Sequence, residues 1–393
     1  MKTKFIGFAA FAAMFSMALT SCSNNEDDLA QAGAAQIDAK KLITTNANII
    51  GASSPRSVRS YDANVGDIQA DGMLVWAFDA TRETAITDAA DFFMGTPTAG
   101  LEHTWDADKS WFKAEEDYFW PEYKLNFVAL TPRTGGGIGD VNISQAAKTA
   151  ELQKPVMTVK VDVPLTTEND GTYGADTQKD IMIASIEEKQ GDGKSAAFTF
   201  KHALSQIVFK GCVDATTTIH KAVVKSIKLV NVASDGTITY TAATDAFAAD
   251  EQGTQNKTYA ANIKNKEVTA KSGEGTNDIT GKDINAEGRD YQLMIMPQTS
   301  VTCTGITREN LSQTTEPTAG TYLLVNADIY ANGDNSNKVL SSGTNVYIPL
   351  GSTTWLPSHK YTYTLMFGDN LLSPITFTAT VHPWTDADKN VEY

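Results

Sequence analysis

The fold class is decided by the stretch Val156-Met157-Thr158-Val159-Lys160-Val161-Asp162-Val163, in which apolar and polar side chains alternate. Successive side chains of a β-strand point to opposite faces, so this alternation is typical of a strand with one face buried and the other in water. The repeated valines add to it, because β-branched residues are favoured in strands. The stretch therefore predicts a half-buried β-strand.

Similar runs recur on both sides of this strand. β-Branched and aromatic residues, bounded by turn formers, predict strands at 43–50, 73–78, 125–130, 221–232, 237–240, 291–296, 321–330, 346–350, 361–367 and 375–381. The Asp235-Gly236 pair predicts that the runs 222–232 and 237–240 form a hairpin. Helical patterns are few, at 144–152 and around Ser205. The sequence therefore predicts an all-β protein made of antiparallel β-sandwiches.

The length of 393 residues suggests two such domains in tandem. The best linker between them is the stretch Glu187-Glu188-Lys189-Gln190-Gly191-Asp192-Gly193-Lys194-Ser195, which is charged, contains glycine and has no apolar residue. The expected organisation is a signal peptide, a flexible tether, an N-terminal sandwich, a linker and a C-terminal sandwich. Their respective ranges are 1–21, 22–42, 43–187, 188–196 and 197–393.

The N-terminus has the features of an export signal. Lys2 and Lys4 precede an apolar run over 5–19, which is shorter than the roughly 20 residues that span a bilayer. Small residues then lead to a cysteine in Leu19-Thr20-Ser21-Cys22. This start resembles a bacterial lipoprotein signal, which implies cleavage before Cys22 and a lipid such as palmitate on that residue. The alternative is an ordinary secretory signal with an incidental cysteine.

The residues after Cys22 are polar and acidic: Ser23-Asn24-Asn25-Glu26-Asp27-Asp28. Such a segment cannot offset the entropy lost on ordering, so it is expected to serve as a flexible tether. An acidic run in this place also resembles the surface-export signal of Bacteroidetes lipoproteins. A solvated tether and an export signal are both open interpretations.

Composition argues against several classes of partner and cofactor. The formal net charge of −15 disfavours nucleic acid, and removal of residues 1–21 would take away Lys2 and Lys4 but no acid. Beside Cys22 the chain has only Cys212 and Cys303, which either pair in an oxidising compartment or remain separate buried thiols. Two thiols and five scattered histidines predict no metal site.

The sequence predicts no catalytic residues and no cofactor. It contains neither Gly-x-Ser-x-Gly nor His-Glu-x-x-His, and the glycine-rich run at 135–139 lacks the Lys-Ser/Thr of a phosphate-binding loop. His202 lies among apolar residues and is interpreted as a structural histidine. The Asp-x-Asp pairs near Trp105 and Trp384 lack the further ligands of a calcium site and are interpreted as solvated turns.

A cluster of aromatic residues allows two interpretations. Such rings bury a large apolar area and often close sandwich cores, but they also form platforms for sugar rings. Core packing is favoured, and the alternative function is a glycan-binding surface lipoprotein of a nutrient-uptake system. The cluster consists of Trp105, Trp111, Phe112, Tyr118, Phe119, Trp120 and Tyr123.

Three stretches together carry a family resemblance. The first is Tyr118-Phe119-Trp120-Pro121 with the strand that follows at 125–130. The second, and most specific, is Asp180-Ile181-Met182-Ile183-Ala184 with the later Phe198-Thr199-Phe200-Lys201-His202-Ala203-Leu204-Ser205. The third is Tyr361-Thr362-Tyr363-Thr364-Leu365 with Val381-His382-Pro383-Trp384. These stretches resemble the fimbrillin-like proteins of Bacteroidetes.

The resemblance implies a two-domain β-sandwich subunit (stalk, tip or anchor) of an adhesive fimbria on the outer membrane. In the family, a lipoprotein precursor is cut after an arginine, the first strand leaves, and a strand from another subunit of the family takes its place. Arg56 and Arg59 lie where such a cut would fall, although both could equally be surface arginines of a linker. The implied partners are other fimbrial subunits, the outer membrane through lipid on Cys22, and ligands on host or bacterial surfaces.

Overall fold

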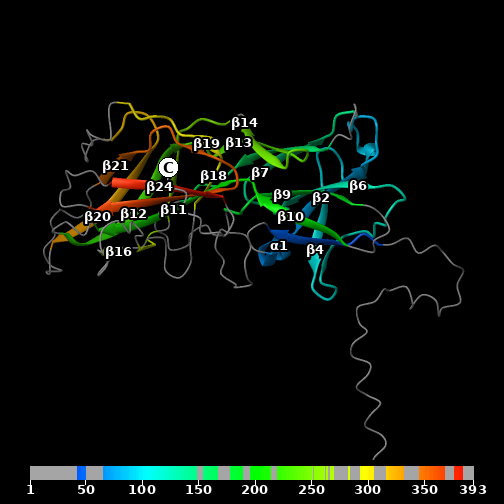
Figure 1. Ribbon diagram of the computed structural model, residues 1–393, viewed down its shortest axis with the longest axis horizontal. Helices are drawn as coiled ribbons and strands as arrows, with labels where there is room; N and C mark the ends of the chain where they lie inside the picture. The colour runs from blue at the N-terminus through cyan, green and yellow to red at the C-terminus, as the bar shows by residue number, and fades with distance from the viewer. Residues whose placement is uncertain are drawn as a thin grey trace, which may run out of the picture. The chain divides into compact units, whose positions relative to one another are not determined.

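The protein is built almost entirely of β-strands in the computed structural model (Figure 1). The structure describes residues 42–49, 65–147, 154–166, 178–188, 195–213, 219–250, 252–261, 263, 266–269, 282–283, 293–304, 316–331, 345–367 and 376–383. Its described helices are the α-helix α1 (Val65–Asp71) and the short 3-10 helix η1 (Ala89–Asp91). None of the described helices is long and apolar enough to cross a membrane. The all-β prediction is confirmed.

The first half of the chain forms a sheet that closes on itself. The strand order is β3-β2-β4-β5-β1-β10-β9-β6, and β2 also pairs with β6 from Leu74–Leu130 to Asp79–Leu125. Apolar side chains of these strands fill the interior. The strands are β1 (Thr45–Ile49), β2 (Met73–Asp79), β3 (Phe92–Met94), β4 (Leu101–Asp106), β5 (Trp111–Ala114), β6 (Leu125–Thr131), β9 (Met182–Glu188) and β10 (Ala196–His202).

A four-stranded sheet packs on the outer face of β2 and β6. Its order is β14-β13-β8-β7, with β7 at Ile138–Ser144, β8 at Val156–Asp162, β13 at Asp235–Thr241 and β14 at Ala246–Asp250. Val159 of β8 shares one apolar core with Trp76 of β2 and Val128 of β6. Both faces of β2 and β6 are thus buried, which explains why their sequences are nearly continuous apolar runs. The alternation predicted for β8 is confirmed by its burial pattern.

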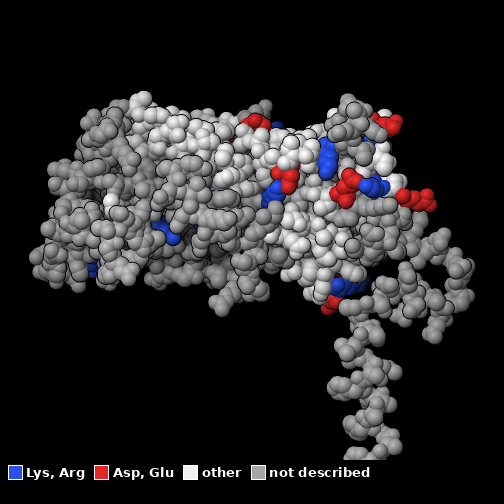
Figure 2. Space-filling model, viewed as in Figure 1, with Lys and Arg blue, Asp and Glu red and all other residues white. Residues whose placement is uncertain are grey.

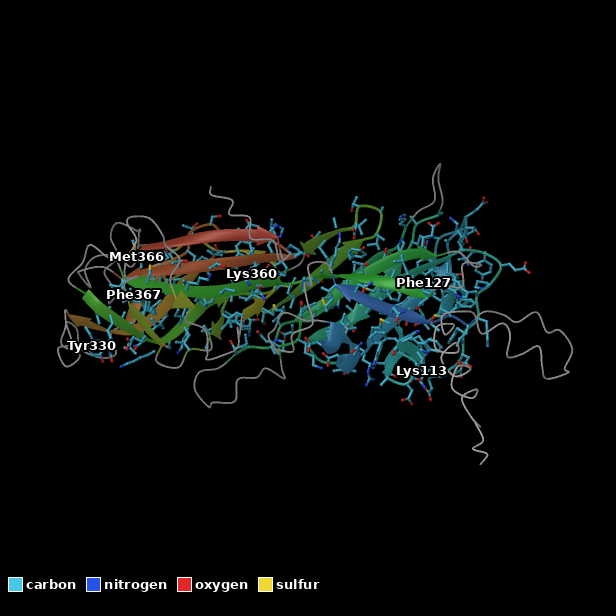
Figure 3. All side chains as sticks on the ribbon, turned by 60° about the horizontal axis from the view of Figure 1, so that its bottom comes forward. Lys113, Phe127, Tyr330, Lys360, Met366 and Phe367 are labelled. Carbon is cyan, nitrogen blue, oxygen red and sulfur yellow. The ribbon has the colours of Figure 1, made fainter. Side chains whose placement is uncertain are left out.

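Two further sheets form a sandwich in the second half of the chain. One has the order β17-β11-β23-β24 with β18 also on β11, and the other has β15-β12-β20-β21 with β16 also on β12. Figure 3 labels Lys360 near the start of β23 and Met366 near its end. The strands are β11 (Ser205–Val213), β12 (Ile219–Val232), β15 (Lys257–Ala260), β16 (Lys266–Thr269), β17 (Lys282–Asp283), β18 (Leu293–Ile295), β20 (Tyr322–Ala331), β21 (Asn345–Pro349), β23 (His359–Phe367) and β24 (Thr376–Pro383), with a separate pair β19 (Gln298–Thr299) and β22 (Thr354–Trp355).

Several local predictions are wrong. The runs predicted as a hairpin, β12 and β13, lie in different sheets, and β13 pairs with β8 and β14 instead. Ser205 begins strand β11 rather than lying in a helix, and Ser144 ends strand β7, while 148–152 falls outside the described residues. Two pairings, β1 with β10 and β11 with β23, are parallel rather than antiparallel. Each error comes from a pairing between segments far apart in the sequence.

The strand pairings also run across the expected linker at 188–196. Strand β10 follows this segment but pairs with β9 and β1 in the closed sheet, and β13 pairs with β8 from the first half. All described residues belong to one compact unit, Leu42–Tyr393. The division of the chain into domains at 188–196 stays a prediction.

A turn of three glycines connects β6 to β7, and it gives a test of this packing. Gly135, Gly136 and Gly137 all have positive φ. A Cβ atom on Gly137 would lie 1.8 Å from the main-chain oxygen of Asp162, at the end of β8, whereas one on Gly351, which also has positive φ, would meet nothing within 4 Å.

We expect Gly137→Ala to lower the free energy of unfolding by roughly 3 kcal/mol, because the clash forces β7 and β8 apart. Gly351→Ala should cost only the roughly 1–2 kcal/mol of a left-handed backbone. Urea unfolding of the two variants measures the difference. Equal losses would contradict the close approach of Gly137 to β8.

Candidate functional site

The first strand, β1, fills a gap in the closed sheet between β10 and β5. It pairs with β10 in parallel over its whole length, from Thr45–Ala196 to Ile49–Phe200 (Figure 1, β1 in blue beside β10). On its other side it pairs with β5 at Thr45–Phe112. The Ile43 amide extends this side by donating to the Tyr118 oxygen at 2.7 Å. Strand β1 therefore closes the sheet between two strands that follow it in the sequence.

The side chains of this segment alternate between the core and the surface. Ile43, Thr45, Ala47 and Ile49 are buried, whereas Asn48 is exposed. The three apolar members belong to the core inside the closed sheet. The Thr45 hydroxyl donates to the Phe112 main-chain oxygen at 3.1 Å. The segment thus supplies both backbone pairing and part of the apolar interior.

Removal of β1 would leave a groove of defined width. Neighbouring strands lie about 4.8 Å apart, so β5 and β10 would be separated by roughly 10 Å, which is the room for one strand. The groove would present unpaired backbone groups of β10 and β5 and an open apolar interior. Such a site binds an extended peptide by adding it as a strand, with alternate side chains entering the interior. The gap filled by β1 is hereafter called the β1 gap.

The predicted processing residues lie outside the described residues. Arg56 and Arg59 fall between the end of β1 at Ile49 and the start of α1 at Val65 in the sequence, and Cys22 precedes β1. The partners of β1 named above, β5 and β10, both follow these arginines. A cut after either arginine would therefore sever β1 from the strands that hold it.

The segment around the buried His202 links the closed sheet to the sandwich in the second half of the chain. His202, the last residue of β10, is buried, and its Nδ1 contacts a carboxylate oxygen of the buried Asp180. Its main-chain oxygen accepts a hydrogen bond from the Ser358 hydroxyl, while the Ser205 hydroxyl donates to the Leu356 oxygen. The two halves of the most specific sequence motif thus meet in space. The arrangement agrees with a structural histidine.

The aromatic cluster divides between the core and the surface. Phe112 and Trp120 are buried, with ring centroids 5.0 Å from Trp105 and 5.7 Å from Phe127, respectively. Phe119 is 41% exposed. Packing in and around the core accounts for the buried rings.

The first Asp-x-Asp turn has the geometry of a capped turn. One Asp106 oxygen accepts the amides of Asp108 and Lys109 at 3.2 and 3.3 Å, and the other lies 3.1 Å from Lys113 Nζ. The hydrogen bond from Lys113 holds the pKa of the Asp106 carboxyl below its usual value. Within the described ranges, no group of three His, Cys, Asp or Glu residues could hold a metal ion. The second Asp-x-Asp pair, near Trp384 in the sequence, falls outside those ranges.

The two internal cysteines are both buried and do not form a disulfide with each other. The Cys303 Sγ donates to the Thr321 oxygen at 3.2 Å, and burial raises the pKa of the Cys303 thiol. Cys212 lies on β11. The geometry agrees with two separate buried thiols.

The described surface mixes charges of both signs. Figure 2 shows basic and acidic side chains next to one another on the face in view. Ion pairs between described residues include Lys124–Glu187 at 2.7 Å and Lys160–Asp140 at 3.2 Å. Each such exposed pair contributes little to stability.

Comparison with known proteins gives a family match and a shared fold. A family model described as fimbrillin-like matches residues 59–384, which includes every described element except β1. A fimbrial protein from Bacteroides vulgatus ATCC 8482 is similar in structure, with a TM-score of 0.51 and 14% identity over 87% of this chain and 99% of that chain. A putative cell adhesion protein from Bacteroides ovatus ATCC 8483 gives a TM-score of 0.43 and 15% identity over 89% and 100%. No curated protein sequence matches the chain.

Two neighbouring positions of β1 test whether its seating depends on the inward face. Ala47→Arg puts a charge into the closed sheet, which costs several kcal/mol, so β1 should detach. We expect hydrogen exchange of the Thr45–Ile49 amides to rise at least about 100-fold, since about 3 kcal/mol corresponds to that factor. Amides of β12 should keep their protection.

The matched control is Asn48→Arg, which places the same side chain on the exposed face of the strand. It should leave the exchange of β1 within a few-fold of the unchanged protein. If both variants exchange alike, β1 does not depend on its inward side chains.

Proposed function

This chain belongs to the fimbrillin-like family, and on that premise we propose that it is a structural subunit of an adhesive surface fimbria, assembled by strand exchange between subunits. The protein is not an enzyme. The observation that carries the proposal is the β1 gap: one N-terminal strand completes a closed sheet whose other strands all follow it in sequence.

The proposed route to the assembled form has two steps, export with lipid on Cys22 and a cut after Arg56 or Arg59. The lipoprotein-like signal delivers the precursor to the outer membrane with lipid on Cys22. A protease then cuts after Arg56 or Arg59, and β1 leaves with the lipid. Support comes from chain order, because this cut separates β1 from β5 and β10 without breaking either strand. A subunit that keeps β1 would remain attached and could serve as the anchor.

The C-terminal strand has the sequence of a replacement for β1. Residues 43–49 read Ile-Thr-Thr-Asn-Ala-Asn-Ile, and residues 375–381 read Ile-Thr-Phe-Thr-Ala-Thr-Val. The buried positions Ile43, Ala47 and Ile49 therefore correspond to Ile375, Ala379 and Val381. The polar residues between them correspond as well. Alternation of this kind fixes the register of a strand, because a shift by one residue would turn the apolar set outward.

One position differs in polarity between the two segments: the polar Thr45 corresponds to the apolar Phe377. Thr45 is fully buried against Phe112, so a phenyl ring there requires its neighbours to move. The position of β24 at the edge of its sheet would also allow it to leave that sheet. Among the described strands it pairs only with β23, at the edge of its sheet.

A donor strand from one subunit and a gap in the next make a head-to-tail contact. Such contacts between unlike surfaces generate an open filament when the rotation between copies does not close a ring. The proposed partners are therefore other subunits of this family, with the groove side of one facing the C-terminal strand of another. The free surface of the filament would carry the contacts to host or bacterial ligands.

We expect the full-length chain to form a ladder of oligomers after treatment with an arginine-specific protease, because the cut frees the β1 gap for a donor strand. Size-exclusion chromatography with light scattering measures the masses. The double variant Arg56→Ala/Arg59→Ala should remain monomeric. A chain that ends at Pro374 should be cut but not polymerise.

Competition with peptides tests whether the C-terminal strand is the donor that enters the β1 gap. A peptide of residues 373–383 should cap the cut chain and shorten the ladder. A peptide of the same composition, with its apolar residues moved by one position, should not. A cut chain that stays monomeric at every concentration and binds neither peptide would show that polymerisation by strand exchange is wrong.

A further inference from the structure

A buried histidine lies beside the start of the β1 gap. His103 of β4 is 2% exposed. It lines a small pocket together with Leu42 and Ile43, which lead into β1, and with Met94 and Tyr118. Loss of the β1 segment would remove two walls of this pocket. Water would then reach the imidazole ring.

With β1 in place, this imidazole is neutral. Its Nδ1 lies 3.1 Å from the Leu101 main-chain oxygen, which can only accept, so Nδ1 carries the proton and donates. Burial lowers the pKa of His103 to about 4, although the Leu101 hydrogen bond acts in the opposite direction. With β1 seated, His103 is therefore neutral at neutral and mildly acidic pH.

The charged groups around His103 are of both signs. Lys113 of β5, which Figure 3 labels, lines the pocket, as does Lys109 from the turn before β5. Glu116 and Asp117 line it from the segment after β5. β2 places the uncharged Met73 opposite His103. The helix α1 packs on β4 and carries the acidic residues Asp67 and Asp71. β4 itself carries Glu102 on its exposed face, where it forms an ion pair with Arg133. Two lysines and two carboxylates in the pocket leave burial as the dominant influence on the ring.

We propose that His103 makes the seating of any strand in the β1 gap dependent on pH, so that a seated strand requires the neutral ring and an empty gap admits the protonated one. Only the biological use of this switch, control of subunit assembly, rests on the proposed function. In the intact chain the seated strand is β1 itself, so the switch is testable without any assembly.

The direction in which pH changes the seating of a strand follows from proton binding to His103. When the gap is empty, the ring is in water and titrates near its ordinary pKa of 6.5, whereas the seated state titrates near 4. Seating a strand between these values releases a proton, so the equilibrium constant for seating falls as the pH falls below about 6.5, and the loss ends near pH 4. Seating should be roughly tenfold weaker at pH 5.5 than at pH 7.5. Above pH 7.5 it should not change.

Hydrogen exchange of the full-length chain tests the proposal. After correction for the intrinsic exchange rate, the protection of the Thr45–Ile49 amides should fall roughly tenfold between pH 7.5 and 5.5. In His103→Gln, whose side chain stays neutral, the protection should be the same at both values. The β12 amides serve as an internal reference for global unfolding, and their protection should not follow that of β1.

The matched control is His359→Gln. The Nδ1 of His359 also contacts the main-chain oxygen two residues earlier, at 2.7 Å from Pro357, but this ring is only half-buried and lies on β23. This variant should keep the tenfold change of β1. A measurement without substitution is the NMR titration of His103, expected near 4 in the intact chain and near 6.5 once the chain is cut and β1 released.

Three results would overturn the proposal: protection of β1 that does not vary with pH, a pH dependence that persists in His103→Gln, or an unchanged titration of His103 after β1 is released. None of them bears on polymerisation. Conversely, a chain that never polymerises can still show the switch, so failures of the two proposals are distinguishable.

Discussion

The structure depends on the closure of one sheet by its first strand. A closed sheet has no free edge, and every strand within it has backbone partners on both sides. Here the closure requires β1, which pairs in parallel with β10 along its whole length and with β5 at one end. Because the strands that hold β1 follow it in the sequence, a single cut can release it. The freed backbone groups of β5 and β10 would then be available to pair with a strand of another molecule.

Much of the fold could be predicted from alternation and turn residues. The strands at 156–163, 221–232 and 361–367 lie close to their predicted ranges, since each has a local pattern. Pairing between distant segments could not be predicted. The Asp-Gly signal suggested a local hairpin, but β13 pairs with β8 instead, and the Ser234 hydroxyl just before β13 donates to Asp162, 72 residues earlier. Ser205 is held in β11 by pairing with β18 at Ile295 and with β23 at His359, both far away in the sequence.

The candidate site could likewise be predicted only in part from the sequence. The sequence indicated a strand at 43–50 and two arginines shortly after it, which together define the element that can leave. It gave no sign that this strand lies parallel to β10, or that His103 lies beside Ile43. The most specific stretch of the family resemblance, 180–184 with 198–205, could be predicted only in part. Asp180 and His202 were seen as parts of one pattern, but only the structure joins them in a buried hydrogen bond, beside the pairing of β9 with β10.

The central claim is that β1 is a temporary part of the protein. Its direct test is the N-terminal residue of the form found in surface fibres of the native host, determined by mass spectrometry of the isolated fibres. The account predicts a start at Ser57 or Ser60, directly after Arg56 or Arg59, with residues 43–49 absent from the fibre. Fibres in which every copy begins at an acylated Cys22 and retains residues 43–49 would contradict it.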